Sequence, residues 1–212
     1  TDSLRYDFMM TDDGEHYYWM RITARIFYWD DDQSIRMFIY RQNIDKEKQQ
    51  EALLSEQLQR DSLSGLYNKA ATQKHIQTLL TAHPQQCFAF FIVDIDNFKL
   101  VNDTYGHAVG DAVIADFAAV LKSQFRPTDV VGRIGGDEFL AFASDMEKET
   151  AERLGKELTE VLEQQNIYVS VGVQWQEHVP SINTLIKAAE KNMYAKKTAF
   201  YEQQNPDRKI RN

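Results

Sequence analysis

The sequence predicts a mixed α+β or α/β fold, in which helices flank a sheet of about five strands behind an N-terminal β-hairpin and a helical linker. Two observations support this fold class. The run Cys87–Val93 is apolar at every position, which is typical of a central strand covered on both faces. Segments with the helical spacing of apolar residues alternate with short strand-like runs around it. The length of 212 residues allows one or two domains.

Residues 15–44 predict the β-hairpin. Apolar and polar side chains alternate over Tyr18–Tyr28, and a second strand, Ile35–Tyr40, follows the polar turn 30–34. Because two strands alone are rarely stable in water, we expect this segment to belong to a larger domain or to pack on another element. On these two long strands, residues 1–44 resemble the C-terminal part of a PAS sensor domain.

Residues 45–60 predict a helical linker, because they are rich in Gln, Glu, Lys and Leu and contain neither Gly nor Pro. Leu54 and Leu58 lie four residues apart, and Leu53 widens the apolar stripe. A dimeric coiled coil is an alternative that so short a segment leaves open.

Residues 61–212 predict one α/β domain. Its expected helices cover 69–82, 110–125, 147–164 and 181–197, and its expected strands cover 87–93, 130–134, 139–143 and 167–173. Gly135 and Gly136 predict a hairpin turn with positive φ angles. The single cysteine, Cys87, is expected to be a buried small hydrophobe without a disulfide, which fits a reducing compartment.

The charge balance argues against one class of partner. The net charge is −8, from 24 basic and 32 acidic residues, whereas nucleic-acid binding normally needs a basic surface. No apolar run reaches the roughly 20 residues that cross a bilayer, and no signal-peptide pattern opens the sequence. We therefore expect a cytoplasmic segment with no direct membrane contact, and leave open an anchor further upstream in a longer chain.

Carboxylates stand at two predicted turns. Asp94 ends the buried strand, with Lys99 five residues on, which suits a metal–phosphate site because Mg²⁺ prefers hard oxygen ligands. Asp137 and Glu138 follow the glycine pair near the tip of the hairpin. Either turn alone could be ordinary solvated turn chemistry. Two acidic turns in one small domain together favour a metal site, including a two-metal site.

The segment Lys99–Asp111 carries groups that could recognise guanine. Asp111 could accept hydrogen bonds from guanine N1–H and its N2 amino group, and Asn102 could bond O6 and N3. The alternative for Asp111 is that it caps the helix that follows. For His107, the alternative is a purely structural histidine.

Six segments, in order, resemble the signature segments of the GGDEF family of diguanylate cyclases. They are Asp61–Lys69, Asp94–Lys99, Asn102–Asp111, Arg133–Phe139, Ser170–Gly172 and Ala189–Tyr194. The resemblance implies the GGDEF fold, a ferredoxin-like nucleotidyl-cyclase palm, over residues 61–212. Within the first segment, Ser64 and Lys69 stand where Thr and Arg are commoner in the family.

The resemblance implies an enzyme that joins two GTP molecules into cyclic di-GMP with Mg²⁺, or Mn²⁺ as a substitute. The implied metal ligands are the carboxylates of Asp94 and Asp137 and the carbonyl of Ile95. The implied catalytic residues are Lys99, Asp137 and Glu138. The implied substrate contacts are Phe98, Asn102, His107, Asp111 and Lys197. Since a carboxylate on Mg²⁺ is a weak base, the metal-ligand role of Asp137 is favoured over proton transfer.

The implied reaction needs two domains, because each holds one GTP and the two molecules must meet; a homodimer is therefore expected. Arg126 and Asp129 stand at the offset of the family's inhibitory Arg-x-x-Asp product site, which implies product inhibition. A surface ion pair would also explain this pattern.

One departure concerns the phosphate contacts. The family's last helix commonly carries a basic residue where Tyr201 stands, so that contact is missing or is supplied by Arg208 or Lys209. Two alternatives to a cyclase stay open at this point. One is a non-catalytic receptor for GTP or cyclic di-GMP, and the other is a cyclase with a different base choice, against which Asp111 argues.

Overall fold

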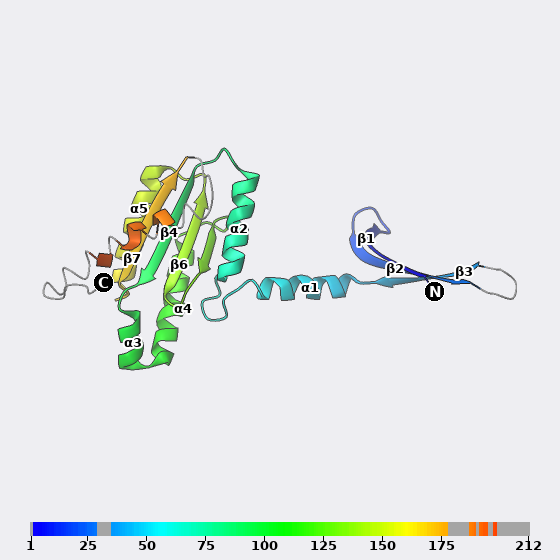
Figure 1. The fold of residues 1–212 in the computed structure, drawn as a ribbon, viewed down its shortest axis with the longest axis horizontal. Coiled ribbons are helices and arrows are strands. Elements are labelled where there is room, and N and C mark those ends of the chain that lie inside the picture. Colours follow the sequence, from blue (N-terminus) through cyan, green and yellow to red (C-terminus); the bar gives the residue numbers. More distant parts are fainter. Residues whose placement is uncertain (1, 29–34, 178–186, 190, 195–196, 199–212) are drawn as a thin grey trace. The chain divides into compact units, whose positions relative to one another are not determined.

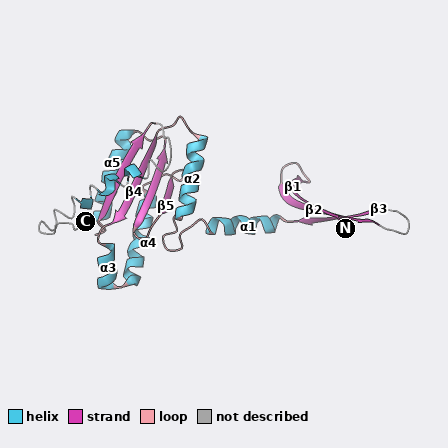
Figure 2. Ribbon diagram, viewed as in Figure 1, coloured by secondary structure: helices cyan, strands magenta, loops and turns pink. Residues whose placement is uncertain are grey.

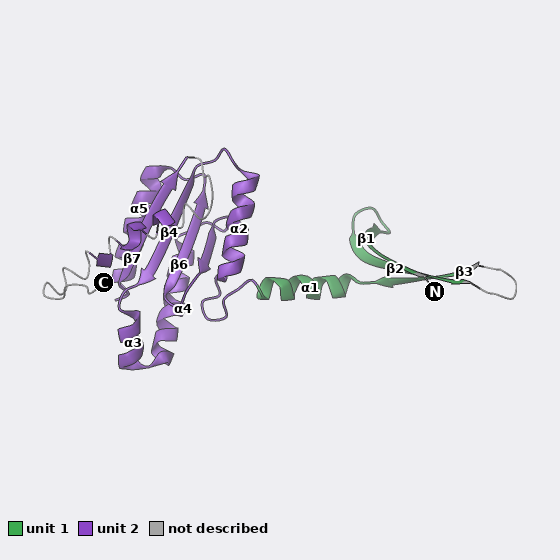
Figure 3. Cartoon of the chain, in the orientation of Figure 1, with its two compact units in different colours: residues 1–58 green, residues 59–212 purple. Residues whose placement is uncertain are grey.

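The structure is a computed structural model that describes residues 2–28, 35–177, 187–189, 191–194 and 197–198. The chain forms two compact units, residues 1–58 and residues 59–212, shown in different colours in Figure 3. No helix in the described part is both long and apolar enough to cross a membrane.

The first unit is a three-stranded antiparallel sheet followed by a helix (Figure 1). Its elements are β1 (Asp2–Thr11), β2 (Tyr17–Tyr28), β3 (Ile35–Asn43) and α1 (Asp45–Gln57). The predicted hairpin is confirmed as β2 and β3, and its turn at 30–34 lies outside the described residues. Strand β1 was not predicted, although Leu4, Tyr6 and Phe8 alternate with polar residues along it.

The first unit has little core among its described residues. Its buried apolar side chains are Ala24 and Ile44, whereas Tyr6, Phe38 and Tyr40 are each more than half exposed. The expectation that the segment belongs to a larger domain or packs on another element stays a prediction. The linker is helical as predicted, and its apolar stripe is exposed, with Leu58 at 80%.

An ion-pair network fixes the start of α1 to the sheet. The Arg21 guanidinium donates to both carboxylate oxygens of Asp7 on β1, at 2.7 and 2.9 Å, and to Glu47 on α1 at 3.0 Å. The amide of Ile44 donates to the carbonyl of Trp19 at 2.9 Å. Two-pronged arginine contacts fix direction as well as distance, so the helix leaves the sheet along a defined path.

The second unit is a four-stranded antiparallel sheet flanked by helices (Figure 2), with strand order β5-β6-β4-β7. Its strands are β4 (Phe88–Ile95), β5 (Val130–Arg133), β6 (Glu138–Ser144) and β7 (Val169–Gln176). Its helices are α2 (Lys69–Ala82), α3 (Phe98–Tyr105), α4 (His107–Ser123) and α5 (Lys148–Glu163). The described residues thus give four strands where about five were expected. Helix α3 was not predicted.

Strand β4 is buried along its whole length, as predicted for a central strand. Alternate side chains enter two cores. Ala89, Phe91 and Val93 pack with α4 and α5 in one core. Phe88, Phe90 and Ile92 pack with α2 and Met193 in the other. Cys87 precedes the strand and is only half-buried, so the prediction of a buried cysteine was wrong; its Sγ donates to the carbonyl of Met146 at 3.3 Å.

The predicted helix 181–197 is helical wherever it is described, over 187–189, 191–194 and 197–198; residues 181–186, 190 and 195–196 lie outside the described part. Gly172 on β7 explains how closely this helix approaches the sheet. A Cβ at Gly172 would overlap the carbonyl oxygen of Ala189 and lie 2.7 Å from the amide nitrogen of Met193. The bare backbone at Gly172 therefore lets the helix reach the end of β4 with Lys197.

Candidate active site

Asp94 lies inside the sheet near the end of β4. It faces Glu138 on β6 and Ser170 on β7 across the strand pairs, and the residue is 4% exposed. Lys197 donates from Nζ to Asp94 Oδ1 at 2.6 Å, which brings the C-terminal helix to this carboxylate. Two of the residues expected at one site, Asp94 and Lys197, are therefore in direct contact.

Burial makes the negative charge on Asp94 unfavourable. Loss of hydration raises its pKa, the hydrogen bond from Lys197 opposes this rise, and the nearby charge of Asp137 adds to it; the net direction is upward. A carboxylate in this situation is stabilised by a further cation. The electrostatic environment of Asp94 thus suits a metal ligand.

The glycine turn brings Asp137 to the same place. The amide of Ile95 donates to the carbonyl of Asp137 at 3.1 Å, so the tip of the β5–β6 hairpin is bonded to the end of β4. Asp94, Ile95 and Asp137 are therefore neighbours. Among the described residues no group of three or more His, Cys, Asp or Glu could hold a metal. Two carboxylates and a carbonyl are, however, a suitable donor set for Mg²⁺, which often takes its remaining ligands from water and phosphate.

The structural reason for glycine in this turn differs from the predicted one. Neither Gly135 nor Gly136 has a positive φ, so the expectation of positive φ angles was wrong. A Cβ at Gly135 would instead lie 2.6 Å from Glu138 Oε2. Glycine at this position therefore leaves room for the Glu138 side chain to fold over the turn.

Arg133 holds the turn from the end of β5, a role that the sequence reasoning missed. Its Nε donates to the carbonyls of Gly135 and Gly136, both at 3.1 Å, and its Nη2 donates to the Gly136 carbonyl at 2.6 Å. Its Nη1 donates to Asp61 Oδ1 at 3.0 Å. The guanidinium thus ties the glycine turn to the first residue of the domain's opening motif. Arg133 was part of a recognised motif, but its partner is remote in sequence.

Asp96 is a second residue that the sequence reasoning left without a role. It is 5% exposed, its Oδ1 accepts from the Ser170 hydroxyl at 2.9 Å, and its buried Oδ2 has no hydrogen-bond partner among the described residues. Burial raises its pKa and the Ser170 hydrogen bond only partly offsets this. Two buried carboxylates at the end of β4 strengthen the case that a cation belongs here.

Helices α3 and α4 form a hairpin that carries the residues expected to bind the nucleotide. Asn97, at φ 56°, precedes α3, and Gly106, at φ 85°, separates the two helices. Asn102 and Phe98 are half-buried, whereas Lys99, His107 and Asp111 are exposed. Because α4 begins at His107 with Gly106 as its cap residue, the alternative that Asp111 caps this helix is wrong.

Gly110 fixes the distance between the two helices. A Cβ there would overlap Asn102 Oδ1 and lie 3.3 Å from Phe98 Cζ. Asn102 on α3 can approach α4 this closely only because position 110 carries no side chain.

On the guanine contact that the resemblance implies for Asn102, Gly110→Ala is expected to raise the KM for GTP about tenfold, because displacing Asn102 would cost roughly one hydrogen bond to the base. Initial rates measured over a range of GTP concentrations check this. The matched control is Gly155→Ala on α5, where a Cβ would lie 2.6 Å from Val173 Cγ2. The control should lower the melting temperature and leave KM unchanged; an unchanged KM in Gly110→Ala would contradict the role given to the α3–α4 contact.

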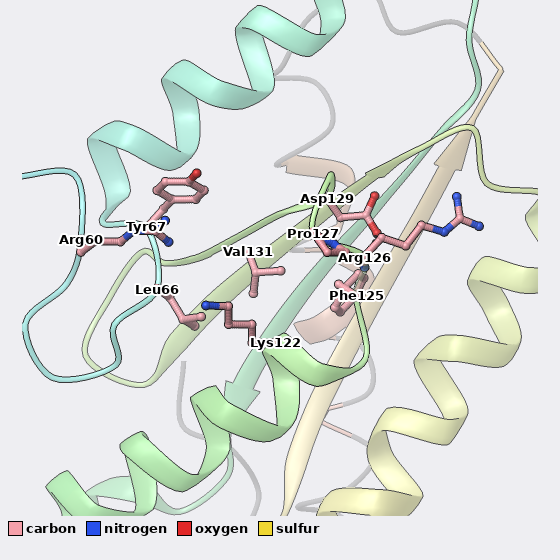
Figure 4. Close-up of a pocket in the computed structure, with 9 residues that line it drawn as sticks. All are labelled: Arg60, Leu66, Tyr67, Lys122, Phe125, Arg126, Pro127, Asp129 and Val131. Carbon is pink, nitrogen blue, oxygen red and sulfur yellow. Dashed lines mark hydrogen bonds between the residues drawn. The ribbon is translucent and has the colours of Figure 1, made fainter. Parts of the chain in front are cut away.

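Arg126 and Asp129 lie apart from these residues, in the loop between α4 and β5, and line a pocket (Figure 4). Asp129 is 8% exposed, and its Oδ2 accepts from the backbone amide of Arg126 at 2.9 Å. Burial raises the pKa of Asp129, against the opposing hydrogen bond from Arg126. The aspartate thus shapes the loop, and the Arg126 side chain stays exposed.

This arrangement of a buried strand-end aspartate, a glycine turn and a helical hairpin has counterparts in known proteins. Residues 58–203 match the family described as diguanylate cyclase, GGDEF domain. The chain belongs to this family. The recognition made from the motifs is therefore confirmed for the GGDEF part. The resemblance of residues 1–44 to a PAS domain stays a prediction.

Curated relatives of this GGDEF chain include the probable diguanylate cyclase DgcT of Escherichia coli, which is 30% identical over 150 residues covering 65% of this chain and 33% of DgcT. Diguanylate cyclase A of Treponema denticola is 28% identical over 135 residues, covering 58% of this chain and 36% of that protein. The chain spans about a third of the length of these two relatives.

Solved structures confirm the GGDEF fold. A microbial GGDEF domain, solved in a study of its interaction with cyclic di-GMP, matches with a TM-score of 0.63 at 27% identity and covers 69% of this chain and 94% of its own. The GGDEF domain of DgcB from Caulobacter crescentus, in complex with cyclic di-GMP, matches with a TM-score of 0.61 at 25% identity and covers 68% and 89% of the two chains.

Proposed function

We propose that this chain is a diguanylate cyclase, which condenses two GTP molecules into cyclic di-GMP and two pyrophosphates. One observation carries the proposal. The acidic residues of the glycine turn, Asp137 and Glu138, are both present, and the turn is bonded to the end of β4 beside the buried Asp94. These carboxylates, one of them buried with a raised pKa, are suited to holding a catalytic metal ion.

A divalent cation, Mg²⁺ or in its place Mn²⁺, would be held by the Asp94 and Asp137 carboxylates and the Ile95 carbonyl. The buried Asp94, with its raised pKa and nearby like charge, supports this choice of ligands. The metal would lower the pKa of the attacking 3′-hydroxyl and neutralise triphosphate charge. Glu138, folded over Gly135, would add its carboxylate at the same turn.

The remaining residues bind and orient GTP. Asn102 and Asp111 would read the guanine edge from the two helices of the hairpin, with Phe98 and His107 near the base. Lys99 and Lys197 would contact the phosphates. Lys197 already lies 2.6 Å from Asp94, so substrate phosphate beside the metal would be within reach of its ammonium. Tyr201, Arg208 and Lys209 lie outside the described residues. That Arg208 or Lys209 supplies the basic phosphate contact missing at Tyr201 stays a proposal.

Two such domains would have to face each other, so we propose a homodimer that acts in the cytoplasm. The exposed leucines of α1 are compatible with pairing of two linkers. Residues 1–44 would be the PAS-like sensor part, 45–60 the linker and 61–212 the cyclase domain. A change in the sensor part would act by altering how the linkers hold the two domains.

The deciding experiment incubates the protein with GTP and Mg²⁺ at several protein concentrations and measures cyclic di-GMP and pyrophosphate. We expect both products in a 1:2 ratio, and we expect Asp137→Ala to form neither. A wild-type protein that binds GTP or cyclic di-GMP without turnover would instead be a receptor. A rate per chain that does not fall on dilution would contradict the dimer.

Product inhibition at Arg126 and Asp129 is part of the proposal. Arg126→Ala is expected to raise the cyclic di-GMP concentration needed for half-inhibition by about tenfold or more, because an arginine contact to a phosphate is a charge-assisted hydrogen bond. Initial rates with added cyclic di-GMP measure this. Inhibition that is the same in Arg126→Ala and wild type would exclude this loop as the inhibitory site.

A further inference from the structure

The pocket beside the Arg126–Asp129 loop has a volume of about 300 Å³ and is formed by three separate parts of the second unit (Figure 4). Arg60 and Tyr67 come from the segment between α1 and α2, Lys122 comes from α4, and Arg126 and Asp129 come from the loop before β5. The volume lies at the lower end of the range for small-molecule sites. It suits one phosphate group with its attached nucleoside rather than a whole cyclic dinucleotide.

The charge of the pocket is opposite to that of the chain. Three of its lining residues are cations, Arg60, Lys122 and Arg126, although the net charge of the whole sequence is −8. Among the described lining residues the one acidic side chain, Asp129, is buried and accepts a hydrogen bond from the Arg126 amide. Arg60 and Lys122, two positive side chains that line one concave place on an acidic protein, indicate a site for an anion.

Arg60 is held in place before any ligand arrives. Its guanidinium lies over the Tyr67 ring, 4.1 Å from the ring centroid, and the backbones of the two residues form a β-bridge. A guanidinium stacked on an aromatic ring loses little freedom when it binds an anion, so its contact is stronger than that of a loose side chain.

The side chains of Lys122 and Arg126 point in different directions, which separates Arg60 and Lys122 from the Arg126 loop. In Figure 4 the Lys122 ammonium points toward Leu66 and the Arg60 end of the pocket, whereas the Arg126 side chain extends away from the other lining residues. A ligand held by the Arg126 loop alone would not contact Arg60 or Lys122.

We propose that Arg60 and Lys122 form a second anion contact in this pocket, opposite the Arg126 loop, and that this contact holds a phosphodiester group of cyclic di-GMP. This inference rests on the proposed function for the identity of the ligand. It adds two residues that lie outside the Arg-x-x-Asp pattern, and one of them stands where the linker ends.

The position of Arg60 connects a ligand in this pocket to the active site. The Gln59 carbonyl accepts from the Asn68 amide at 2.8 Å, and the Tyr67 carbonyl accepts from the Arg133 amide at 2.8 Å. Arg133 in turn holds the glycine turn and Asp61. A ligand that joins Arg60 to the Arg126 loop therefore holds both ends of β5, whose last residue fixes the catalytic turn. Product in this pocket would act on the turn and on the linker junction together.

The test is calorimetric titration of the full chain with cyclic di-GMP, without GTP, for wild type, Lys122→Glu, Arg60→Gln and the control Lys148→Glu. Lys148 is exposed on α5 and pairs loosely with Glu152 at 3.9 Å, so the control makes the same charge change elsewhere. We expect Lys122→Glu and Arg60→Gln each to weaken binding by about tenfold or more, and the control to bind as wild type. Because Lys122 is exposed and does not pack in the core, its variant guards against a loss of fold in Arg60→Gln.

A weakening confined to the Arg60 and Lys122 variants supports the inference whether or not the protein turns over GTP, so its outcome is separate from that of the cyclase assay. Equal affinity in all four proteins overturns it, as does a wild type that does not bind. Pyrophosphate is titrated in parallel. If it binds as tightly as cyclic di-GMP, the pocket is a general anion site and the assignment to the cyclic dinucleotide is overturned.

Discussion

Replacing Asp94 by asparagine is expected to lower GTP turnover by about a thousandfold, because the loss of roughly 4 kcal/mol of transition-state stabilisation has this effect on a rate. Asp94 is the proposed metal ligand that the sheet fixes most firmly, paired across both neighbouring strands and 4% exposed. Asparagine has nearly the same shape but no charge, so the change removes the negative charge that stabilises the metal and preserves the packing. The rate of cyclic di-GMP formation at saturating GTP and Mg²⁺ measures the effect.

The control is Asp116→Asn, which makes the same chemical change at an exposed position on α4. It should keep the wild-type rate. If Asp94→Asn also kept a rate close to that of wild type, the metal would have to bind elsewhere and the proposed site would be wrong.

The stability of the wild type relative to this variant is predicted to depend on pH. The folded protein raises the pKa of Asp94 through burial, so the proton is bound more tightly in the folded state than in the unfolded state. The resulting stabilisation is complete below the ordinary aspartate pKa of about 4 and is lost as pH rises through the folded-state value. Asparagine stays neutral throughout.

In metal-free buffer the melting temperature of Asp94→Asn, relative to wild type, is therefore expected to rise between about pH 4 and pH 7. Thermal melts at both pH values, with EDTA present, measure this difference. A difference that stays constant or falls would mean that Lys197 compensates the buried charge fully.

The elements that the sequence predicted well are those whose pattern comes from burial. Strand β4 is apolar at almost every position because helices cover both of its faces, and α2 begins and ends at the predicted residues. Helix α3 was missed because its eight residues are too few to give a clear helical pattern, and tertiary contacts stabilise it. The glycine turn was located correctly, but the reason for its glycines lies in the Glu138 side chain, which no turn statistics include.

The site divides in the same way. Asp94, Asp137, Asn102 and Asp111 could be selected because they stand in recognisable local motifs. Arg133 and Asp96 could not be given roles, because their partners, Asp61 and Ser170, are 72 and 74 residues away in the sequence. Likewise, spacing along the chain gives no sign that Lys197 would bond to a carboxylate 103 residues earlier. Contacts across the sheet decide these roles, and only the folded chain reveals them.

Arg133→Lys is expected to lower turnover by about a hundredfold, since small displacements of catalytic groups have effects of this size. The guanidinium makes three hydrogen bonds to the turn carbonyls and one to Asp61, whereas a lysine ammonium is a point charge that cannot reproduce this fork. Because the turn carries Asp137, the Mg²⁺ concentration needed for half-maximal activity should also rise. A general loss of stability would not cause that shift. The control is Arg153→Lys on α5, whose exposed pair with Glu157 contributes little.

A variant of Asp61 tests whether the contacts of Arg133 with Asp61 and with the glycine turn act together. Burial alone would raise the pKa of Asp61, but hydrogen bonds from the amide and hydroxyl of Ser64 and from Arg133 outweigh it and lower the pKa, so the carboxylate is charged at neutral pH. Asp61→Asn should therefore reduce turnover less than Arg133→Lys, and the double variant should lose little more than Arg133→Lys alone, because both changes break the same contact. If the two losses multiply, Asp61 acts on the turn by another route. If they do not multiply, Asp61 and the glycine turn are coupled through Arg133. A displacement at the end of the linker would then be transmitted to Asp137 through Arg133.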